Sequence, residues 1–184
     1  MNSYVDPTIS WMLASQLDQI IKNWPLDDWS INVEVFEKIT QLLPFGSTIL
    51  EFGSGASSNL LKQFYKVISI EDDQNFINKY DGVEYIYIDS DKTGYNFPTL
   101  KEKLKNMKYE LLIIDGPNYG RENINNHLDI IDQNCLIIWD DTQVYEKFAN
   151  EMAEKLNRKC TTFNCKPNGD YWGPRGGKKF SLIQ

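Results

Sequence analysis

Acidic side chains recur directly after short apolar runs along this 184-residue chain. They follow five predicted strands in turn, and the set is Glu51, then Glu71 and Asp72, then Asp89 with Ser90 beside it, then Asp115, then Asp140 and Asp141. In an open parallel sheet, ligands bind outside the carboxyl ends of the strands, which meet at one edge. Because clustered carboxylates repel one another, we expect this edge to bind cations or hydroxyl groups.

A glycine turn follows the first of these strands. The run TILEFGSGASS, from Thr48 to Ser58, passes from an apolar strand through Gly53 and Gly55 into a helix. Glycines let the backbone turn sharply and approach a ligand closely, and we expect Ser57 or Ser58 to cap the helix. The turn therefore has the features of a nucleotide-binding βαβ unit.

The type of cofactor depends on three positions around this turn. Glu71 lies 18 residues beyond Gly53, at the end of the second strand, where an acid can accept hydrogen bonds from both ribose hydroxyls. A dinucleotide site prefers a third glycine where this chain has Ser58, and Glu51 would repel a pyrophosphate. A carboxylate at that position suits a cofactor with a cationic amino-acid end, although an NAD-binding or nucleotide-sugar-binding oxidoreductase remains the alternative.

The elements that position these residues alternate between strand and helix from residue 47 onward. Strands are predicted at residues 47–52, 66–71, 83–88, 109–115, 134–139, 159–164 and 178–183. Helices are predicted at 98–107 and 142–156, the second with Val144, Phe148, Met152 and Leu156 on its apolar face. This succession predicts a doubly wound α/β fold with a mostly parallel seven-stranded sheet and helices on both faces. Two amphipathic helices, over residues 6–24 and 30–43, are expected to cover it.

Residues 30–145 resemble the small bacterial class I methyltransferases that use S-adenosylmethionine, and are similar to the glucuronoxylan and catechol-type O-methyltransferases. The shared motifs are E-x-G-S-G-x-S at 51–57, I-E-x-D at 70–73, D-G-P at 115–117 and D-D at 140–141. The resemblance implies a Rossmann-like methyltransferase fold and O-methylation of a small-molecule or saccharide hydroxyl. A non-catalytic module that keeps the fold is a further alternative.

The resemblance also implies roles for individual residues. Gly53, Gly55 and Ser57 would line the methionine end of the cofactor, Glu71 would hold the ribose, and Asp89 and Ser90 would lie beside the adenine. Asp115 would stand where the methyl group meets the acceptor. The full expected cofactor set is Glu51, Gly53, Gly55, Ser57, Ser58, Glu71, Asp72, Asp89, Ser90 and Asp115.

Two mechanisms fit Asp115, Asp140 and Asp141. In catechol-type enzymes an acid after the fourth strand and an acid pair after the fifth hold a divalent ion, and an all-oxygen ligand set suits Mg²⁺. Alternatively, Asp115 or Asp141 acts without metal as the catalytic base or orienting acceptor. Asp141 or Thr142 is also placed to cap the helix that follows.

Candidate acceptor-binding residues are Arg121, Trp172 and Arg175. Arg121 opens a predicted helix, where a cation is electrostatically disfavoured, so we expect the strand-end acids to pair with it in preference to a carboxylate-bearing substrate. Trp172 and Arg175 lie in a glycine-rich loop that suits either a hairpin or contact with a sugar or ring-bearing acceptor. His127, the only histidine, is expected to pack against the sheet.

Length and composition limit the domain organisation, the partners and the location that we expect for this chain. The length fits one domain, with N-terminal helices over 1–45 and the α/β core over 46–184. With 26 acidic and 19 basic residues the formal charge is −7, so a nucleic-acid partner is not expected. No signal-like or membrane-spanning run is visible and the three cysteines form no disulfide framework, so a cytoplasmic location is expected. The acceptor and the oligomeric state do not follow from the sequence.

Overall fold

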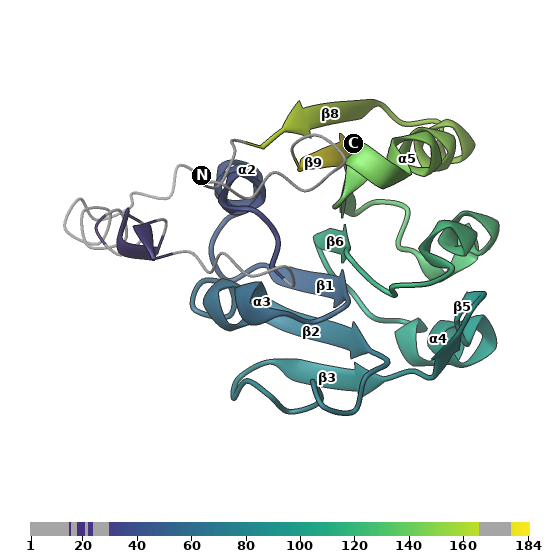
Figure 1. Cartoon of the computed structure of the whole chain (residues 1–184), viewed down its shortest axis with the longest axis horizontal. Coiled ribbons are helices and arrows are strands. Elements are labelled where there is room, and N and C mark those ends of the chain that lie inside the picture. Colours follow the sequence, from purple (N-terminus) through teal and green to yellow (C-terminus); the bar gives the residue numbers. More distant parts are fainter. Residues whose placement is uncertain (1–14, 16–17, 21, 24–29, 166–177) are drawn as a thin grey trace.

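A computed structural model of the chain describes residues 15, 18–20, 22–23, 30–165 and 178–184 (Figure 1). The α-helices are α2 (Val33–Leu42), α3 (Ala56–Leu61), α4 (Phe97–Leu104) and α5 (Thr142–Leu156), with 3-10 helices η1 (Arg121–Asn126) and η2 (Leu128–Ile130). The strands are β1 (Thr48–Phe52), β2 (Lys66–Glu71), β3 (Glu84–Tyr87), β4 (Ser90–Asp91), β5 (Gly94–Tyr95), β6 (Leu111–Ile114), β7 (Leu136–Trp139), β8 (Cys160–Asn164) and β9 (Lys179–Ile183).

Seven strands form one sheet in the order β3-β2-β1-β6-β7-β9-β8. The pairs from β3 to β7 are parallel, and β9 pairs antiparallel with both β7 and β8. The carboxyl ends of β1, β2 and β3 therefore lie at one edge, where their arrowheads end in Figure 1. The strand order reverses between β1 and β6, and a switch point of this kind is where open α/β sheets bind ligands.

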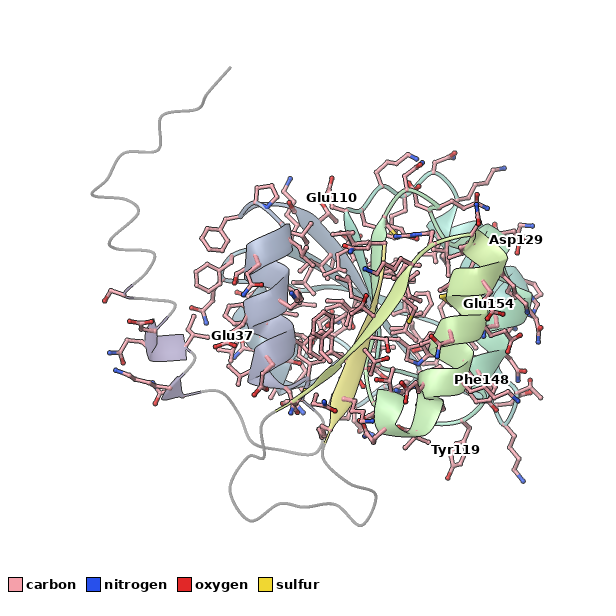
Figure 2. The ribbon with its side chains drawn as sticks, turned by 90° about the horizontal axis from the view of Figure 1, so that it is seen from above. Glu37, Glu110, Tyr119, Asp129, Phe148 and Glu154 are labelled. Carbon is pink, nitrogen blue, oxygen red and sulfur yellow. The ribbon has the colours of Figure 1, made fainter. Side chains whose placement is uncertain are left out.

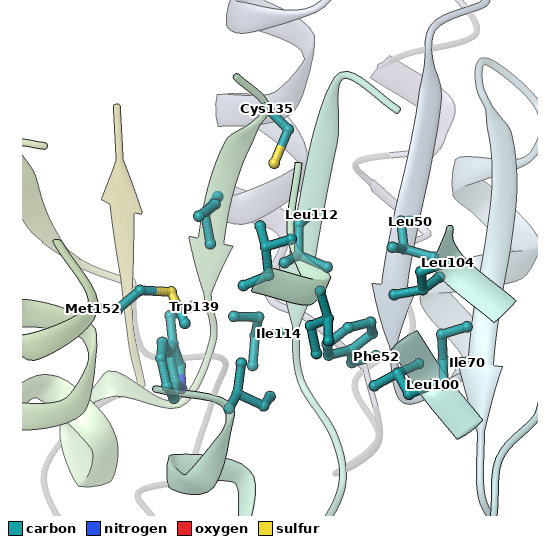
Figure 3. Close-up of a cluster of buried hydrophobic side chains, with 14 of the residues drawn as sticks. Leu50, Phe52, Ile70, Leu100, Leu104, Leu112, Ile114, Cys135, Trp139 and Met152 are labelled. Carbon is teal, nitrogen blue, oxygen red and sulfur yellow. The ribbon is translucent and has the colours of Figure 1, made fainter. Parts of the chain in front are cut away.

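Helices cover both faces of the sheet, because the central strands are apolar on both sides. On one face, Ile49 and Val67 pack with side chains of α2 and α3. On the other face, β1 and β2 pack against α4, while β6 and β7 pack against η1 and α5; Figure 3 shows this cluster, with Leu50, Phe52, Ile70, Leu100, Leu104, Leu112, Ile114, Trp139 and Met152 among its members. In the view from above, the sheet lies between α2 and α5 (Figure 2).

The sequence prediction of seven strands in a mostly parallel sheet with helices on both faces is confirmed. Every strand appears within two residues of its predicted bounds. The small antiparallel ribbon of β4 and β5 was not predicted, because strands of two residues leave no periodicity to detect. The helix expected over residues 6–24 falls largely outside the described residues. In the described part, no helix has both the length and the hydrophobicity to cross a bilayer.

Three local predictions need correction. Helix α3 begins after Gly55, not at a serine cap, and Ser58 instead accepts a hydrogen bond from the Gly55 amide at 3.1 Å. Helix α2 begins at Val33, not at residue 30 where the expected helix begins. Val144 was predicted on the apolar face of α5 but is 42% exposed. The buried residues of this helix are Thr142, Ala149, Met152 and Ala153.

Candidate active site

The glycine turn packs against the loop after β6, directly at the switch point. Gly53 has φ +89°, and a Cβ atom placed there would lie 2.9 Å from the Gly116 nitrogen. A Cβ at Gly116 would lie 2.9 Å from the Gly53 Cα. The amides of Asp115 and Gly116 both donate to the Phe52 carbonyl, which closes the junction. Only glycines allow these two loops to meet this closely.

Glu51 lies buried beneath this junction, near the end of β1, with 4% of its surface exposed. Its Oε1 atom has no hydrogen-bond partner in the described structure. Burial raises the pKa of Glu51 to about 8, the Ser58 and Ser69 hydroxyls offset part of this rise, and the nearby Asp115 and Glu71 carboxyls add to it. A buried carboxyl surrounded by other acids favours either a proton or a cationic ligand.

Glu71, at the end of β2, is anchored to the turn that it borders. Its Oε2 accepts from the Ser54 amide at 2.8 Å, and its Oε1 accepts from the Asp72 and Asp73 amides, both at 2.9 Å. Burial raises the pKa of Glu71 despite these three hydrogen bonds, and the Asp72 carboxylate adds to the rise. Oε2 keeps one lone pair for a ligand, whereas both lone pairs of Oε1 are used.

The other expected cofactor residues lie around the same edge. Ser57 is buried in α3 and accepts from the Ile31 amide at 3.4 Å, which ties the segment before α2 to the glycine turn. The Ser90 hydroxyl donates to the Asp72 carboxylate, so the β4-β5 ribbon is fastened to the end of β2. Asp89 is exposed beside them.

Asp115, Asp140 and Asp141 converge at the ends of β6 and β7. One carboxylate oxygen from each lies within 4.8 Å of the others, a convergence that the sequence alone could not show. Burial raises the pKa of Asp115 to about 6, an effect opposed by Arg121 and reinforced by Asp141. Burial also raises the pKa of Asp140 well above its usual value, with Asp115 and Asp141 adding to the rise.

Arg121 provides a buried positive charge between two of these acids. Its side chain is 4% exposed, with Nη2 at 3.7 Å from Asp115 Oδ1 and Nη1 at 3.7 Å from Asp141 Oδ2. It also donates to the backbone carbonyls of Asp115 and Pro117, and its guanidinium lies 4.8 Å from the centre of the Tyr145 ring. The expected pairing with the strand-end acids is therefore observed.

Two residues of the site were missed from the sequence. Lys178, just before β9, lowers the pKa of Asp115 and Asp140, and its Nζ donates to the Ser30 carbonyl at 3.4 Å. Tyr95, in the β4-β5 ribbon, is 2% exposed and donates to the Ile70 carbonyl at 3.3 Å, beside Gly116. Lys178 was visible only as one of a basic pair, and Tyr95 had no motif to mark it.

Some candidates are not brought to this edge. The His127 ring stacks on Phe97 of α4 with centroids 3.9 Å apart, so it packs on a helix and not on the sheet as expected. Trp172 and Arg175 lie outside the described residues. The described cysteines, Cys135, Cys160 and Cys165, form no disulfide.

No protein-family model matches the chain, and no protein with a curated description matches it in sequence. The similar structures include the methyltransferase domain of a bacterial Hen1 (8% identity, TM-score 0.55, covering 83% of this chain and 96% of that one). The precorrin-6y C5,15-methyltransferase of Geobacter metallireducens is similar at 12% identity and TM-score 0.55, covering 86% of this chain and 93% of that one.

A third similar structure is MycE, a methyltransferase of the mycinamycin pathway solved with Mg, S-adenosylhomocysteine and mycinamycin VI. It has 10% identity and a TM-score of 0.54, and the match covers 92% of this chain and 54% of MycE. At these identities the likeness concerns the fold. The chain has the Rossmann-like fold of the class I S-adenosylmethionine-dependent methyltransferases.

Proposed function

We propose that the protein is an S-adenosylmethionine-dependent methyltransferase that acts on a hydroxyl group of a small molecule or saccharide. The observation that carries this proposal is the buried Glu51, whose Oε1 has no partner under the glycine turn. A pyrophosphate would be repelled at this position, whereas the ammonium of a methionine group would supply the missing partner. The dinucleotide alternative gains no support from this geometry.

The remaining cofactor contacts follow from the order of the strands. Ser54, Gly55 and the free lone pair of Glu71 Oε2 lie on the β2 side of Glu51, where they would hold the ribose. Asp72 and Ser90, which are hydrogen-bonded to each other, would border the adenine beyond it. Asp115, which begins the second cluster of acids after β6, would then lie nearest the methyl group.

Within that cluster the three acids have different surroundings. The side chain of Asp141 is 31% exposed and that of Asp115 is 25% exposed, so an acceptor can reach both, whereas Asp140 is only 2% exposed. Asp115 has a pKa of about 6, which suits a base that works near neutral pH. We assign Asp115 as the proton acceptor and Asp141 as the group that orients the hydroxyl.

When bound, S-adenosylmethionine would supply the methyl group from its sulfonium, and the sulfur would keep the electron pair of the broken S–C bond. The acceptor oxygen forms the new bond to carbon, and its proton passes to Asp115. Arg121 keeps the resulting charges balanced, because it pairs with both Asp115 and Asp141. Positioning of the hydroxyl for attack can contribute about 7–11 kcal/mol to the lowering of the barrier.

A divalent ion also fits the donor set. Three carboxylates that converge within 4.8 Å are the hard oxygen ligands that Mg²⁺ prefers. Burial first, and repulsion between the acids second, raise the pKa values of Asp115 and Asp140, and a bound cation would favour their ionised forms. MycE, whose structure contains Mg and S-adenosylhomocysteine, has a fold of this type. If present, the ion would be held by Asp115, Asp140 and Asp141, and it would lower the pKa of the acceptor hydroxyl.

The direct test is calorimetric titration of the protein with S-adenosylmethionine, S-adenosylhomocysteine and NAD. We expect the first two to bind and NAD not to bind. Replacing Glu71 by Ala should weaken the binding of S-adenosylhomocysteine by about 1–3 kcal/mol, which is the scale of hydrogen bonds to a charged group. Binding of NAD without S-adenosylhomocysteine would overturn the proposal.

A further inference from the structure

Gln143, in the first turn of α5, joins the side chain of Asp141 to the start of β9. Its Nε2 donates to Asp141 Oδ1 at 2.9 Å, and its Oε1 accepts from the Lys179 amide, also at 2.9 Å. Because a backbone N–H can only donate, the Lys179 contact fixes which end of the side-chain amide faces Asp141. The Asp141 carboxylate is therefore held by a donor that the backbone of a neighbouring strand holds in turn.

The backbone of Asp141 has an uncommon conformation at the same place. Asp141 has φ 56° and ψ 32°, in the left-handed region, where the chain turns from β7 into α5. Residues other than glycine rarely adopt this conformation, and those that do gather at functional sites. Both the main chain and the side chain of Asp141 are thus constrained.

The other oxygen of Asp141 faces Arg121. Asp141 Oδ2 lies 3.7 Å from Arg121 Nη1, and the Arg121 side chain is 4% exposed. In the described structure, Nη1 is buried and has no hydrogen-bond partner. Because a buried donor without a partner is costly, we expect a polar atom of a bound ligand to lie beside it. Nη1 and Oδ2 therefore offer such a ligand a donor and an acceptor side by side.

Gln143 decides which oxygen of Asp141 takes part in this pair. The torsion that turns an aspartate carboxylate is soft, so its orientation depends on the contacts that its oxygens make. The amide of Gln143 binds Oδ1 and leaves Oδ2 beside Arg121. The Lys179 contact also fixes the start of β9, where the neighbouring Lys178 lowers the pKa of both Asp115 and Asp140.

We propose that Gln143 is a positioning residue, which holds Asp141 so that its Oδ2 and the Nη1 atom of Arg121 together orient the acceptor. This inference rests on the proposed function and goes further, because it assigns a role to a residue outside the set that contacts cofactor or acceptor. In the competing explanation, Gln143 only ties α5 to β9. Suitable variants separate the two roles.

Two variants divide the contacts of Gln143. Gln143→Glu keeps the length of the side chain and an oxygen for the Lys179 amide, but it loses the donor that faces Asp141. Gln143→Met also lacks this donor and adds no charge. Asn150→Asp is the matched control, because it adds one negative charge at an exposed position of the same helix.

Crystal structures of the wild type and the three variants, each with S-adenosylhomocysteine, report the orientation of Asp141 directly. We expect the wild type and Asn150→Asp to have the contacts described above. In both Gln143 variants, we expect the Asp141 carboxylate to turn away from Arg121. An Asp141 that keeps its orientation in either Gln143 variant would overturn the inference.

Methyl transfer from labelled S-adenosylmethionine to catechol and to methyl β-D-glucopyranoside measures the consequence. With whichever probe the wild type methylates, both Gln143 variants should lower kcat at least tenfold, while KM for S-adenosylmethionine and affinity for S-adenosylhomocysteine stay unchanged. A kcat equal to that of the wild type, or a loss in Gln143→Glu alone, would overturn the inference. If neither probe is methylated, the orientation of Asp141 in the crystals decides. Failure of the wild type to bind S-adenosylhomocysteine would instead overturn the proposed function.

Discussion

At the scale of single residues, Glu51 links binding of the proposed cofactor to protons. With a pKa of about 8, it is mostly protonated in the free protein at pH 7, and it must ionise to pair with an ammonium. We therefore expect affinity for S-adenosylhomocysteine to rise about tenfold per pH unit between pH 6 and 7, and to level off above pH 8. Asp115 and Glu71, which face Glu51 from β6 and β2, add to its pKa and belong to the same titration.

Calorimetry at pH 6, 7 and 8 in buffers of different ionisation enthalpy measures both the affinity and the protons released. Glu51→Gln should bind more weakly at pH 8, with a flat pH dependence and no proton release. Glu110→Gln, at an exposed carboxyl before β6, serves as the matched control. A variant that kept the full pH dependence would show that another group is responsible.

The acid cluster of Asp115, Asp140 and Asp141 gives a second prediction at this scale. If the three residues hold Mg²⁺, EDTA should abolish methyl transfer and added Mg²⁺ should restore it, while the affinity for S-adenosylhomocysteine stays unchanged. Asp140→Asn should then raise the Mg²⁺ concentration needed for half-maximal activity. Activity that persists in EDTA but disappears in Asp115→Asn would favour the metal-free base.

At the scale of elements, the junction between the β1 turn and the β6 loop depends on the absence of a side chain at Gly53. Both Gly53 and Gly46 have positive φ, at +89° and +88°, so alanine at either position has similar backbone strain. Only at Gly53 would the added Cβ meet backbone atoms, at 2.9 Å from Gly116 nitrogen, whereas nothing lies within 4 Å at Gly46. Gly53→Ala should therefore lose S-adenosylhomocysteine binding, and Gly46→Ala should keep it.

Urea unfolding of the two alanine variants completes this comparison. In both variants the free energy of unfolding should fall by about 1 kcal/mol, because alanine is strained in the left-handed conformation. In Gly53→Ala it should fall by roughly a further 1–3 kcal/mol, because the added Cβ overpacks the junction. Equal losses, with binding intact in both, would contradict a tight junction.

The elements also show what could be predicted from sequence. Apolar runs such as Leu111–Ile114 predicted the central strands, because a buried parallel strand needs apolar residues on both faces. Strand-end acids were predicted to lie at one edge, because parallel strands end at the same edge of a sheet, but the sequence could not show that Asp115, Asp140 and Asp141 converge. Val144 was placed in the buried stripe of α5, because helical spacing does not reveal where the first turn leaves the sheet. Tyr95 and Lys178 reach the site through tertiary packing, which no local pattern encodes.

At the scale of the whole molecule, the architecture concentrates buried carboxyl groups at one edge of the sheet. Burial is the largest cause of the raised pKa at Glu51, Glu71, Asp115 and Asp140 alike. The chain also carries a formal charge of −7 at pH 7. Such an arrangement favours ligand binding over stability of the free protein, since a cationic ligand offsets charges that the fold itself leaves uncompensated.

The stability of the free protein should consequently fall as pH rises from about 5 to 8. Each of these four groups has a higher pKa in the folded state than in the unfolded state, so the folded state binds more protons in this range. Their stabilising contribution is complete below the unfolded pKa values near 4. It is lost as pH rises through the folded values, about 6 for Asp115 and about 8 for Glu51. Each 1 kcal/mol lost should lower Tm by about 2–4 °C in a chain of this size.

Thermal unfolding between pH 5 and 8.5 at constant ionic strength checks this prediction. Surface carboxyls with a lowered pKa, such as Asp129 and Asp132, make the stability rise with pH instead. Their titration is complete below this pH range. Glu51→Gln should remove much of the decline above pH 6.5, because an amide in the same place does not ionise. S-adenosylhomocysteine should raise Tm more at pH 8 than at pH 6, since its ammonium stabilises the ionised Glu51 that the free protein disfavours. A Tm that stayed constant or rose between pH 5 and 8 would mean that these carboxyls are less buried in solution than the fold places them.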